Sequence, residues 1–142
     1  MNSSSDNYKR DIEVRIPVDS INLEGNLNIP EGARGIVIFV HGSGSSRHSP
    51  RNQYVADELR RAGLGTLLFD LLTIEEERID MMTRHLRFDI ELLSKRLIDV
   101  TGWVLNNQNQ RYEYRIFRCH YKGGNRTRSS KVIVYLVIGL TV

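Results

Sequence analysis

The sequence predicts an α/β fold, and three observations carry that prediction. Apolar and polar residues alternate from Ile12 to Pro30, which is typical of strands with one buried face. Two runs of consecutive apolar residues, 35–40 and 65–70, lack this alternation, as expected of strands covered on both faces in a mostly parallel sheet. A segment with helical signals separates the two runs. The class is therefore α/β, with an antiparallel pair at the start and no internal repeat.

The first two strands form a predicted β-hairpin. The alternating residues run over 12–18 and 21–29, and Asp19 and Ser20 supply the turn between them. Gly25 lies inside the second strand, where a glycine indicates a bulge or a bend.

The segment after the first buried strand has helix signals at both ends. Ser49 is a preferred N-cap, Pro50 fits the first helical position and Gly63 stands just past the last turn. The expected apolar stripe consists of Val55, Leu59 and Ala62. Residues 35–70 are therefore predicted to form a right-handed parallel strand–helix–strand unit.

A second helix is predicted from Arg84 to Asn106, with Gly102 as a local weak point. Its apolar residues recur at steps of three and four, namely Leu86, Ile90, Leu93, Leu97, Val100 and Val104. The acidic residues that precede it indicate a solvated helix start, namely Glu75, Glu76, Glu77 and Asp80.

Length and composition predict one soluble globular domain. The 142 residues are 40% apolar and 26% charged, which excludes extended disorder. The one cysteine, Cys119, cannot form an internal disulfide, and the polar N-terminus lacks the apolar stretch of a secretory signal. No apolar run approaches the length of a membrane-spanning helix. We therefore expect a cytoplasmic protein without a membrane contact.

The positive charge is concentrated in a divergent basic tail, residues 107–142. Residues 1–106 carry 13 Lys/Arg and 16 Asp/Glu, a charge of −3, whereas the tail carries 7 Lys/Arg and one acid, a charge of +6, giving +3 in total. Aromatic residues interleave with these cations, as in arms that bind single-stranded nucleic acid. The tail is either such an arm, for nucleic acid or an acidic partner, or the product of a shifted reading frame. We favour the shifted frame over nucleic-acid binding.

The loop over 41–52, HGSGSSRHSPRN, carries the strongest functional signal. Its small residues leave backbone N–H groups free to face a phosphate or a developing oxyanion. It contains neither Gly-Lys-Ser/Thr nor G-x-G-x-x-G, so it is not a nucleotide P-loop and gives a dinucleotide site no support. His41 and His48 lack the partners of a zinc site. We expect no metal and no cofactor.

The residues around this loop resemble the N-terminal half of the α/β-hydrolase superfamily, in its dienelactone hydrolase-like branch. The resemblance covers residues 11–106 and rests on HGSGSSRHSPRN, the strand end TLLFDLLT and the helix start LRFDIELL, in order and spacing. It implies an oxyanion-hole loop formed by the backbone of Gly42, Ser43 and Gly44, with His41 shaping the loop. The implied substrate is a small-molecule ester or lactone. The alternative is a tight glycine turn and helix cap without catalytic meaning.

The catalytic groups that the resemblance requires are missing. The family places its nucleophile, acid and histidine after a fifth strand that should begin soon after Asn106. The motif G-x-S-x-G occurs nowhere in the 142 residues. The sequence therefore predicts a truncated hydrolase that keeps the oxyanion-hole loop and has no turnover. The alternative function is a non-catalytic interaction protein that uses the basic tail.

Other polar residues are weaker candidates for this chemistry. Ser43, Ser45, Ser46 and Cys119 lie outside any nucleophile elbow, and His48 and His85 are expected at the surface. Asp70 ends a parallel strand, where sites form in such sheets, but a carboxylate there also serves turns and helix caps.

Two further expectations concern the tail. Back-translated and read one base later, Ile116 to Arg128 permits most of a family nucleophile elbow, although Thr or Ile replaces the serine. The resemblance also implies that strand 35–40 lies between strand 65–70 and the missing fifth strand, which leaves an open edge. We expect the apolar run Val132 to Ile138 to cover that edge as an added strand.

Overall fold

The computed structural model describes residues 11–40, 47–107, 112–117 and 134–140. The strands are β1 (Ile12–Val18), β2 (Ile21–Asn28), β3 (Gly35–Val40), β4 (Gly65–Phe69), β5 (Tyr112–Phe117) and β6 (Val134–Leu140). The helices are α1 (Pro50–Arg61), α2 (Ile74–Thr83), the short 3-10 helix η1 (Leu86–Phe88) and α3 (Ile90–Asn107). None of the described helices is both long and apolar enough to cross a bilayer.

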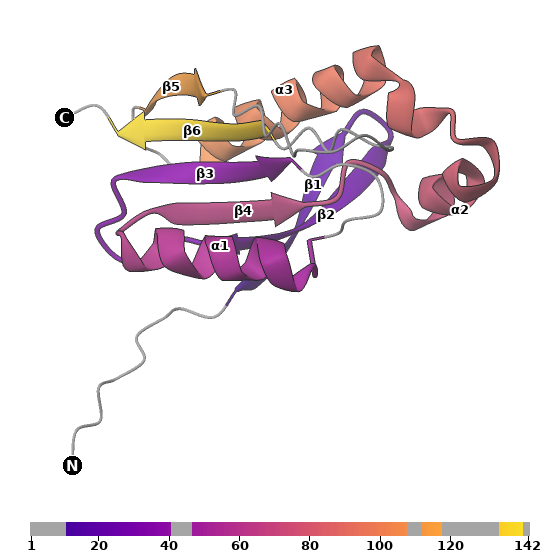
Figure 1. Ribbon diagram of the computed structural model, residues 1–142. Coiled ribbons are helices and arrows are strands. Elements are labelled where there is room, and N and C mark those ends of the chain that lie inside the picture. The colour runs from indigo at the N-terminus through magenta and orange to yellow at the C-terminus, as the bar shows by residue number, and fades with distance from the viewer. Residues whose placement is uncertain (1–10, 41–46, 108–111, 118–133, 141–142) are drawn as a thin grey trace.

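The strands form one mixed sheet in the order β1-β2-β4-β3-β6-β5, with helices on both faces (Figure 1). The α/β class is therefore confirmed. Among the described strands only β3 and β4 pair in parallel, and the other four pairings are antiparallel. The prediction of a mostly parallel sheet is wrong, because an antiparallel hairpin flanks the parallel pair on one side and two antiparallel strands flank it on the other.

The β1–β2 hairpin turns at Asp19, which has a positive φ of 51°. Its register runs without interruption from Ile12–Leu27 to Val18–Ile21, so Gly25 is not a bulge. A Cβ at Gly25 would lie 3.1 Å from both the carbonyl oxygen of Leu68 and the Cβ of Phe69. Glycine is needed here because β2 approaches β4 closely.

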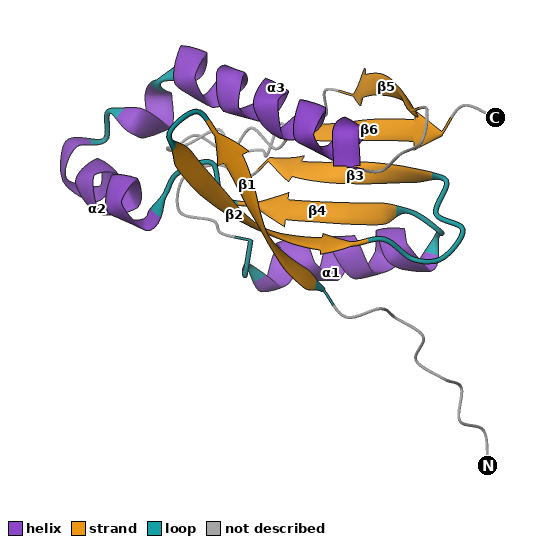
Figure 2. Ribbon diagram, turned by 180° about the vertical axis from the view of Figure 1, so that it is seen from behind, coloured by secondary structure: helices purple, strands orange, loops and turns teal. Residues whose placement is uncertain are grey.

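The core lies on both faces of the parallel strands. All six residues of β3 are buried, and their side chains alternate between two clusters. Val37 and Phe39 pack with Ala56 of α1, whereas Ile36 and Ile38 pack in the larger cluster that includes Val100 and Val104 of α3. Figure 2 shows α3 lying across the face opposite α1. Both buried runs are thus strands covered on two faces, as predicted.

Helix α1 begins at Pro50, and Val55 and Leu59 pack against the core, both as predicted, but the rest of its inward face differs from the expected stripe. Ala62 is exposed, whereas Asn52, Ala56 and Arg60 are buried at spacings of four. Arg60 donates from Nη1 to the Thr66 hydroxyl at 3.1 Å, so this face accepts a cation beside the apolar cluster. The sequence pattern missed this because an arginine was not expected to face inward.

The long helix predicted from Arg84 starts only at Ile90. Arg84 has a φ of 56° and ends α2, and a single 3-10 turn follows before α3. Asp89 then begins α3 by accepting the backbone N–H of Leu92 at 3.0 Å. Ile90 is 68% exposed, so the inward stripe of α3 excludes it.

Two strands of the tail extend the sheet beyond β3. β6 pairs antiparallel to β3, from Gly35–Gly139 to Val40–Val134, and so covers the edge that the sequence predicted to be open. It is the added strand expected from the apolar run, displaced by two residues. β5, which the sequence analysis did not predict, pairs with the outer side of β6.

Candidate functional site

The predicted oxyanion-hole loop begins where β3 ends, at Val40. His41, Gly42, Ser43 and Gly44, with Ser45 and Ser46, lie outside the described residues. The description resumes at Arg47, three residues before α1 begins. Because β3 and β4 are parallel, the loop starts at the same edge of the sheet where Asp70 follows β4.

Arg47 ties the end of this loop to two strands. Its Nε donates to Asn26 Oδ1 at 3.0 Å and its Nη2 donates to Glu24 Oε2 at 3.0 Å. Its backbone N–H donates to Asp70 Oδ1 at 3.0 Å, and Nη1 donates to the other oxygen of the same carboxylate. These four residues, Glu24, Asn26, Arg47 and Asp70, are named here the Arg47 cluster.

Two members of the Arg47 cluster are largely removed from solvent. The side chains of Arg47 and Asp70 are 12% and 13% exposed, whereas that of Glu24 is 43% exposed. Burial alone would lower the pKa of Arg47, but the hydrogen bonds and charges of Asp70 and then Glu24 outweigh burial and raise it. Arg47 therefore stays charged and anchors the end of the loop, and it does not serve as a group that exchanges protons.

Within the described residues, Asp70 neither caps a helix nor lies in a turn. Its carboxylate binds the loop end, and its backbone N–H donates to the carbonyl oxygen of Glu24 at 3.0 Å. The sequence did not indicate Arg47 as the partner of this carboxylate, or Glu24 and Asn26 as the other side chains that Arg47 binds. Glu24 and Asn26 alternate along β2 with the buried Leu23 and the close-packed Gly25. This alternation indicates that the side chains of Glu24 and Asn26 both point to the opposite face of the sheet from Leu23.

A second group of charges holds α2 at the same edge of the sheet. Arg96 of α3 donates from Nη1 to the Leu71 carbonyl oxygen at 2.7 Å, and its two Nη atoms donate to the Glu76 carboxylate at 2.7 and 2.6 Å. Glu76 also completes a capping box with Thr73 at the start of α2. The hydrogen bonds from Arg96 lower the pKa of Glu76, against the opposing effect of burial. Leu71, Glu76 and Arg96 are named here the Arg96 cluster.

The predicted solvated acidic helix start is therefore wrong in part. Asp80 is buried, with a side chain only 5% exposed. It accepts the backbone N–H groups of Leu86 and Arg87 at 2.8 and 3.1 Å, and Nε of Arg87 at 2.7 Å. Burial raises the pKa of Asp80, but the hydrogen bonds from Arg87 and Leu86 outweigh it, so the net direction is downward. Glu75 and Glu77 do remain exposed.

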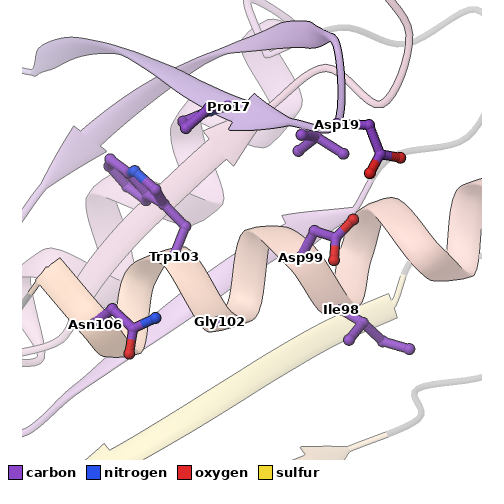
Figure 3. A pocket seen from close by; sticks show the side chains of 8 residues that line it. Pro17, Asp19, Ile98, Asp99, Gly102, Trp103 and Asn106 are labelled. Atoms are coloured by element: carbon purple, nitrogen blue, oxygen red, sulfur yellow. The ribbon is translucent and has the colours of Figure 1, made fainter.

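An open groove of about 520 Å³ lies between the hairpin turn and α3 (Figure 3). It is lined by Pro17, Val18, Asp19, Ile98, Asp99, Gly102, Trp103 and Asn106. Lys95 already bridges its two carboxylates, at 2.7 Å from Asp19 and 2.9 Å from Asp99. None of the lining residues is a serine, cysteine or histidine, so the groove offers no nucleophile.

The remaining predicted candidates do not assemble a catalytic group. His48 and His85 are exposed, as predicted, and Cys119 lies outside the described residues. Within the described ranges, no three His, Cys, Asp or Glu side chains gather as a metal site would require. What the described residues build is a clamped loop end at the carboxyl ends of a parallel strand pair.

The described residues define an α/β protein in which Arg47 anchors the end of a loop at the carboxyl edge of the parallel strand pair. The crystal structure of a dienelactone hydrolase from Anabaena variabilis matches it with a TM-score of 0.67 and 60% sequence identity, over 69% of this chain. The resemblance to the dienelactone hydrolase-like branch of the α/β-hydrolases is thereby confirmed.

Two curated proteins of Mycobacterium tuberculosis, from strains CDC 1551 and H37Rv, are each 56% identical over 104 residues. Both are named "Putative phosphoribosyl transferase". No family model matches the chain. The chain spans 23% of the length of these curated relatives and 45% of the Anabaena hydrolase.

Proposed function

We propose that residues 11–106 form the oxyanion-binding half of a dienelactone hydrolase-like hydrolase. The donors are backbone N–H groups of Gly42, Ser43 and Gly44, and His41 shapes their loop. The observation that carries the proposal is the Arg47 cluster, which fixes the end of this loop against two strands. Preorganised donors stabilise a developing oxyanion because they need no rearrangement as charge appears.

The group that this site would bind is the carbonyl oxygen of an ester or lactone. Cleavage needs a nucleophile within hydrogen-bond reach of a base, and a third group that orients the base. No G-x-S-x-G elbow occurs in the sequence, and the described side chains offer no substitute. In this proposal these 142 residues bind the acyl group of the substrate and do not by themselves turn it over.

Phosphoribosyl transfer, the activity in the names of the curated relatives, is less well supported for this segment. The matched region is 23% of those proteins, so most of their length lies outside it. The same segment is 60% identical to a hydrolase whose fold it shares with a TM-score of 0.67. Similarity in both sequence and structure favours the hydrolase-like function.

An anion titration tests the proposed site. Methylphosphonate, a tetrahedral anion, is added to the ¹⁵N-labelled full chain, and the amide resonances are followed. We expect saturable shifts at Gly42, Ser43 and Gly44, and none at Gly102 of α3. Absence of loop shifts, or equal shifts at Gly102, would contradict the proposal.

The lack of turnover has its own test. We expect hydrolysis of p-nitrophenyl acetate by the full chain to stay at the rate of buffer alone. Saturable turnover that a serine-directed phosphonate abolishes would show that a nucleophile is present.

A further inference from the structure

The segment 72–88, which contains α2 and η1, lies outside the apolar core. The chain leaves the core after Leu71, which is buried in the larger cluster, and returns to it at Leu93, which packs against the same cluster. Neither apolar cluster of the described residues includes a side chain from 72–88. Helices α1 and α3, in contrast, each contribute buried apolar side chains to one of the clusters.

The apolar residues of this segment bury little surface. Ile74, Ile79, Met81 and Met82 of α2 are between 54% and 89% exposed, and Phe88 is 73% exposed. Because hydrophobic stabilisation scales with the apolar surface removed from water, these side chains contribute little to holding α2 on the molecule. Segments with few buried apolar contacts are the ones that open locally while the rest of a fold stays intact.

Polar contacts hold the segment together internally. The buried Asp80 carboxylate accepts the backbone N–H groups of Leu86 and Arg87, and so joins α2 to η1. At the start of α2, the Thr73 hydroxyl accepts the backbone N–H of Glu76 at 3.2 Å, and Glu76 Oε2 accepts that of Thr73 at 2.9 Å. Because these contacts lie within 72–88, α2 and η1 should move together.

Arg96 connects this segment to the body of the molecule. Among the helices and strands that the structure describes, the side chain that binds 72–88 is that of Arg96, which donates to both oxygens of the Glu76 carboxylate at 2.7 and 2.6 Å. Its Nη1 also donates to the Leu71 carbonyl oxygen at 2.7 Å, so the guanidinium is fixed where the chain leaves the core. A bidentate, charge-assisted pair of this kind is the strongest contact available to α2.

The position of α2 leaves the core intact when this contact breaks. α2 lies at the tip of the molecule, beyond the carboxyl ends of β3 and β4 and away from the sheet layers (Figure 1). Because none of the side chains of 72–88 belongs to an apolar cluster of the described residues, departure of the segment removes no member of either cluster.

We propose that residues 72–88 open and close as one unit, named here the flap, while the sheet and the core stay folded. The ion pair between Glu76 and Arg96, named here the latch, keeps the flap closed. When the flap opens, Arg96 loses Glu76 and keeps the Leu71 carbonyl oxygen, which leaves an unpaired cation at the carboxyl edge of the sheet. The inference does not rest on the proposed function, because the flap and the latch contain no residue of the loop 41–52.

Hydrogen exchange of the full chain, followed by mass spectrometry, tests the flap without any substitution. We expect the backbone amides of α2 to exchange at least about tenfold faster than those of β3 and β4, after correction for their intrinsic rates. Low concentrations of urea should accelerate exchange steeply in β3 and β4 and only slightly in α2, because the dependence on urea scales with the surface that an opening exposes.

Two arginine variants test the latch. Arg96→Met removes it and should accelerate exchange in α2 about 100-fold, since that is the typical effect of breaking a buried ion pair. Arg60→Met is the matched control, because Arg60 is also buried but lies on α1, where it binds Asp11 and Thr66. Arg60→Met should accelerate exchange in β3 and β4 and leave the rate in α2 unchanged.

Glu76→Gln repeats the test with a side chain of the same shape, and circular dichroism checks that each variant is folded. This variant should accelerate exchange in α2 by about tenfold. Three results would overturn the proposal: exchange in α2 as slow as in β3 and β4, an equal urea dependence in both, or no acceleration by Arg96→Met and Glu76→Gln. Equal acceleration of α2, β3 and β4 by Arg60→Met would also overturn it, because α2 would then open only when the whole fold unfolds.

Discussion

The partly buried Arg47 and the buried Arg96 both lie near the carboxyl ends of the strands, but they organise different parts of the molecule. Arg47 binds a carboxylate and an amide of β2 and the carboxylate of Asp70 just after β4, and so ties the end of the proposed site loop to the sheet. Arg96 binds one carboxylate and one carbonyl group, and so fixes the rotation of α2. The first arginine anchors the end of the loop that we propose binds an oxyanion, whereas the second fixes which side of α2 faces the sheet.

The difference shows that burial alone does not define the role of a charged residue. The side chains of Arg47 and Arg96 are 12% and 7% exposed. What separates them is redundancy, because Arg47 keeps a second carboxylate if one is lost, and Arg96 does not. Substitutions in the two clusters should therefore lower the free energy of unfolding by different amounts.

Loss of Arg96 should have the largest effect. Arg96→Met keeps the apolar stem but leaves Glu76 unpaired, and breaking such a pair typically costs about 3–5 kcal/mol. Chemical denaturation of the variant should show a loss of about 3 kcal/mol. A change below about 1 kcal/mol, the level of a surface pair, would show that Arg96 does not hold α2.

Loss of Asp70 should cost less, about 2 kcal/mol, because Glu24 still neutralises Arg47. Asp70→Ala should also weaken methylphosphonate binding by about tenfold, or ~1.4 kcal/mol, since the loop end loses its anchor. Arg96→Met is the control, and it should leave anion binding unchanged. Equal effects of the two variants on binding would contradict the division of roles.

Gly25 lies between Glu24 and Asn26 of the Arg47 cluster, so a substitution there tests how closely β2 must approach β4. Gly25→Ala places a Cβ against Leu68 and Phe69 and should cost about 1–2 kcal/mol. Gly102→Ala, where no atom lies within 4 Å of the added carbon, should stabilise α3 by about 0.5–1 kcal/mol. In thermal unfolding, the Tm should fall for Gly25→Ala and rise for Gly102→Ala. Shifts of the same sign for the two variants would contradict this prediction.

Acid should loosen the Arg96 cluster. Because Arg96 lowers the pKa of Glu76 in the folded state, the pair stabilises the protein above the ordinary carboxyl pKa of 4.5 and loses that contribution as the pH falls through the lowered value. Glu76→Gln should flatten the fall in Tm between pH 5 and pH 3 by roughly 2–4 °C. If Tm fell equally with pH in the wild type and in Glu76→Gln, the acid sensitivity would not come from the Glu76–Arg96 pair.

Exposed ion pairs give the smallest expected effect. Lys95 bridges Asp19 and Asp99, and these partners raise its pKa, yet its side chain is 54% exposed. Lys95→Gln should therefore leave Tm unchanged within error. A clear loss would mean that the groove beside α3 depends on this bridge.

Most of the helices and strands could be predicted because each is specified by residues within its own segment. The turn at Asp19, the start of α1 at Pro50 and the two doubly covered strands follow from alternation, capping preference and apolar runs. The predicted long helix failed at Arg84, where a left-handed residue ends α2 and the buried Asp80 carboxylate binds the next turn. The spacing of apolar residues cannot reveal that a buried carboxylate binds the backbone of the following turn.

The partners within the candidate site were not predictable in this way. Arg47 and Asp70 are 23 residues apart in sequence, and Glu24 comes from another strand. Only the pairing of β2 with β4, and of β4 with β3, brings them together. The resemblance indicated the loop, and the fold supplied its anchor.

We propose that the loop over 41–52 binds an oxyanion and that the chain supplies no group to attack the bound carbonyl. Intact-mass spectrometry after incubation with a fluorophosphonate and, separately, with an activated ester tests this most directly. We expect the full chain to keep its unmodified mass in both reactions. A stoichiometric phosphonyl or acyl adduct on any residue would contradict the account.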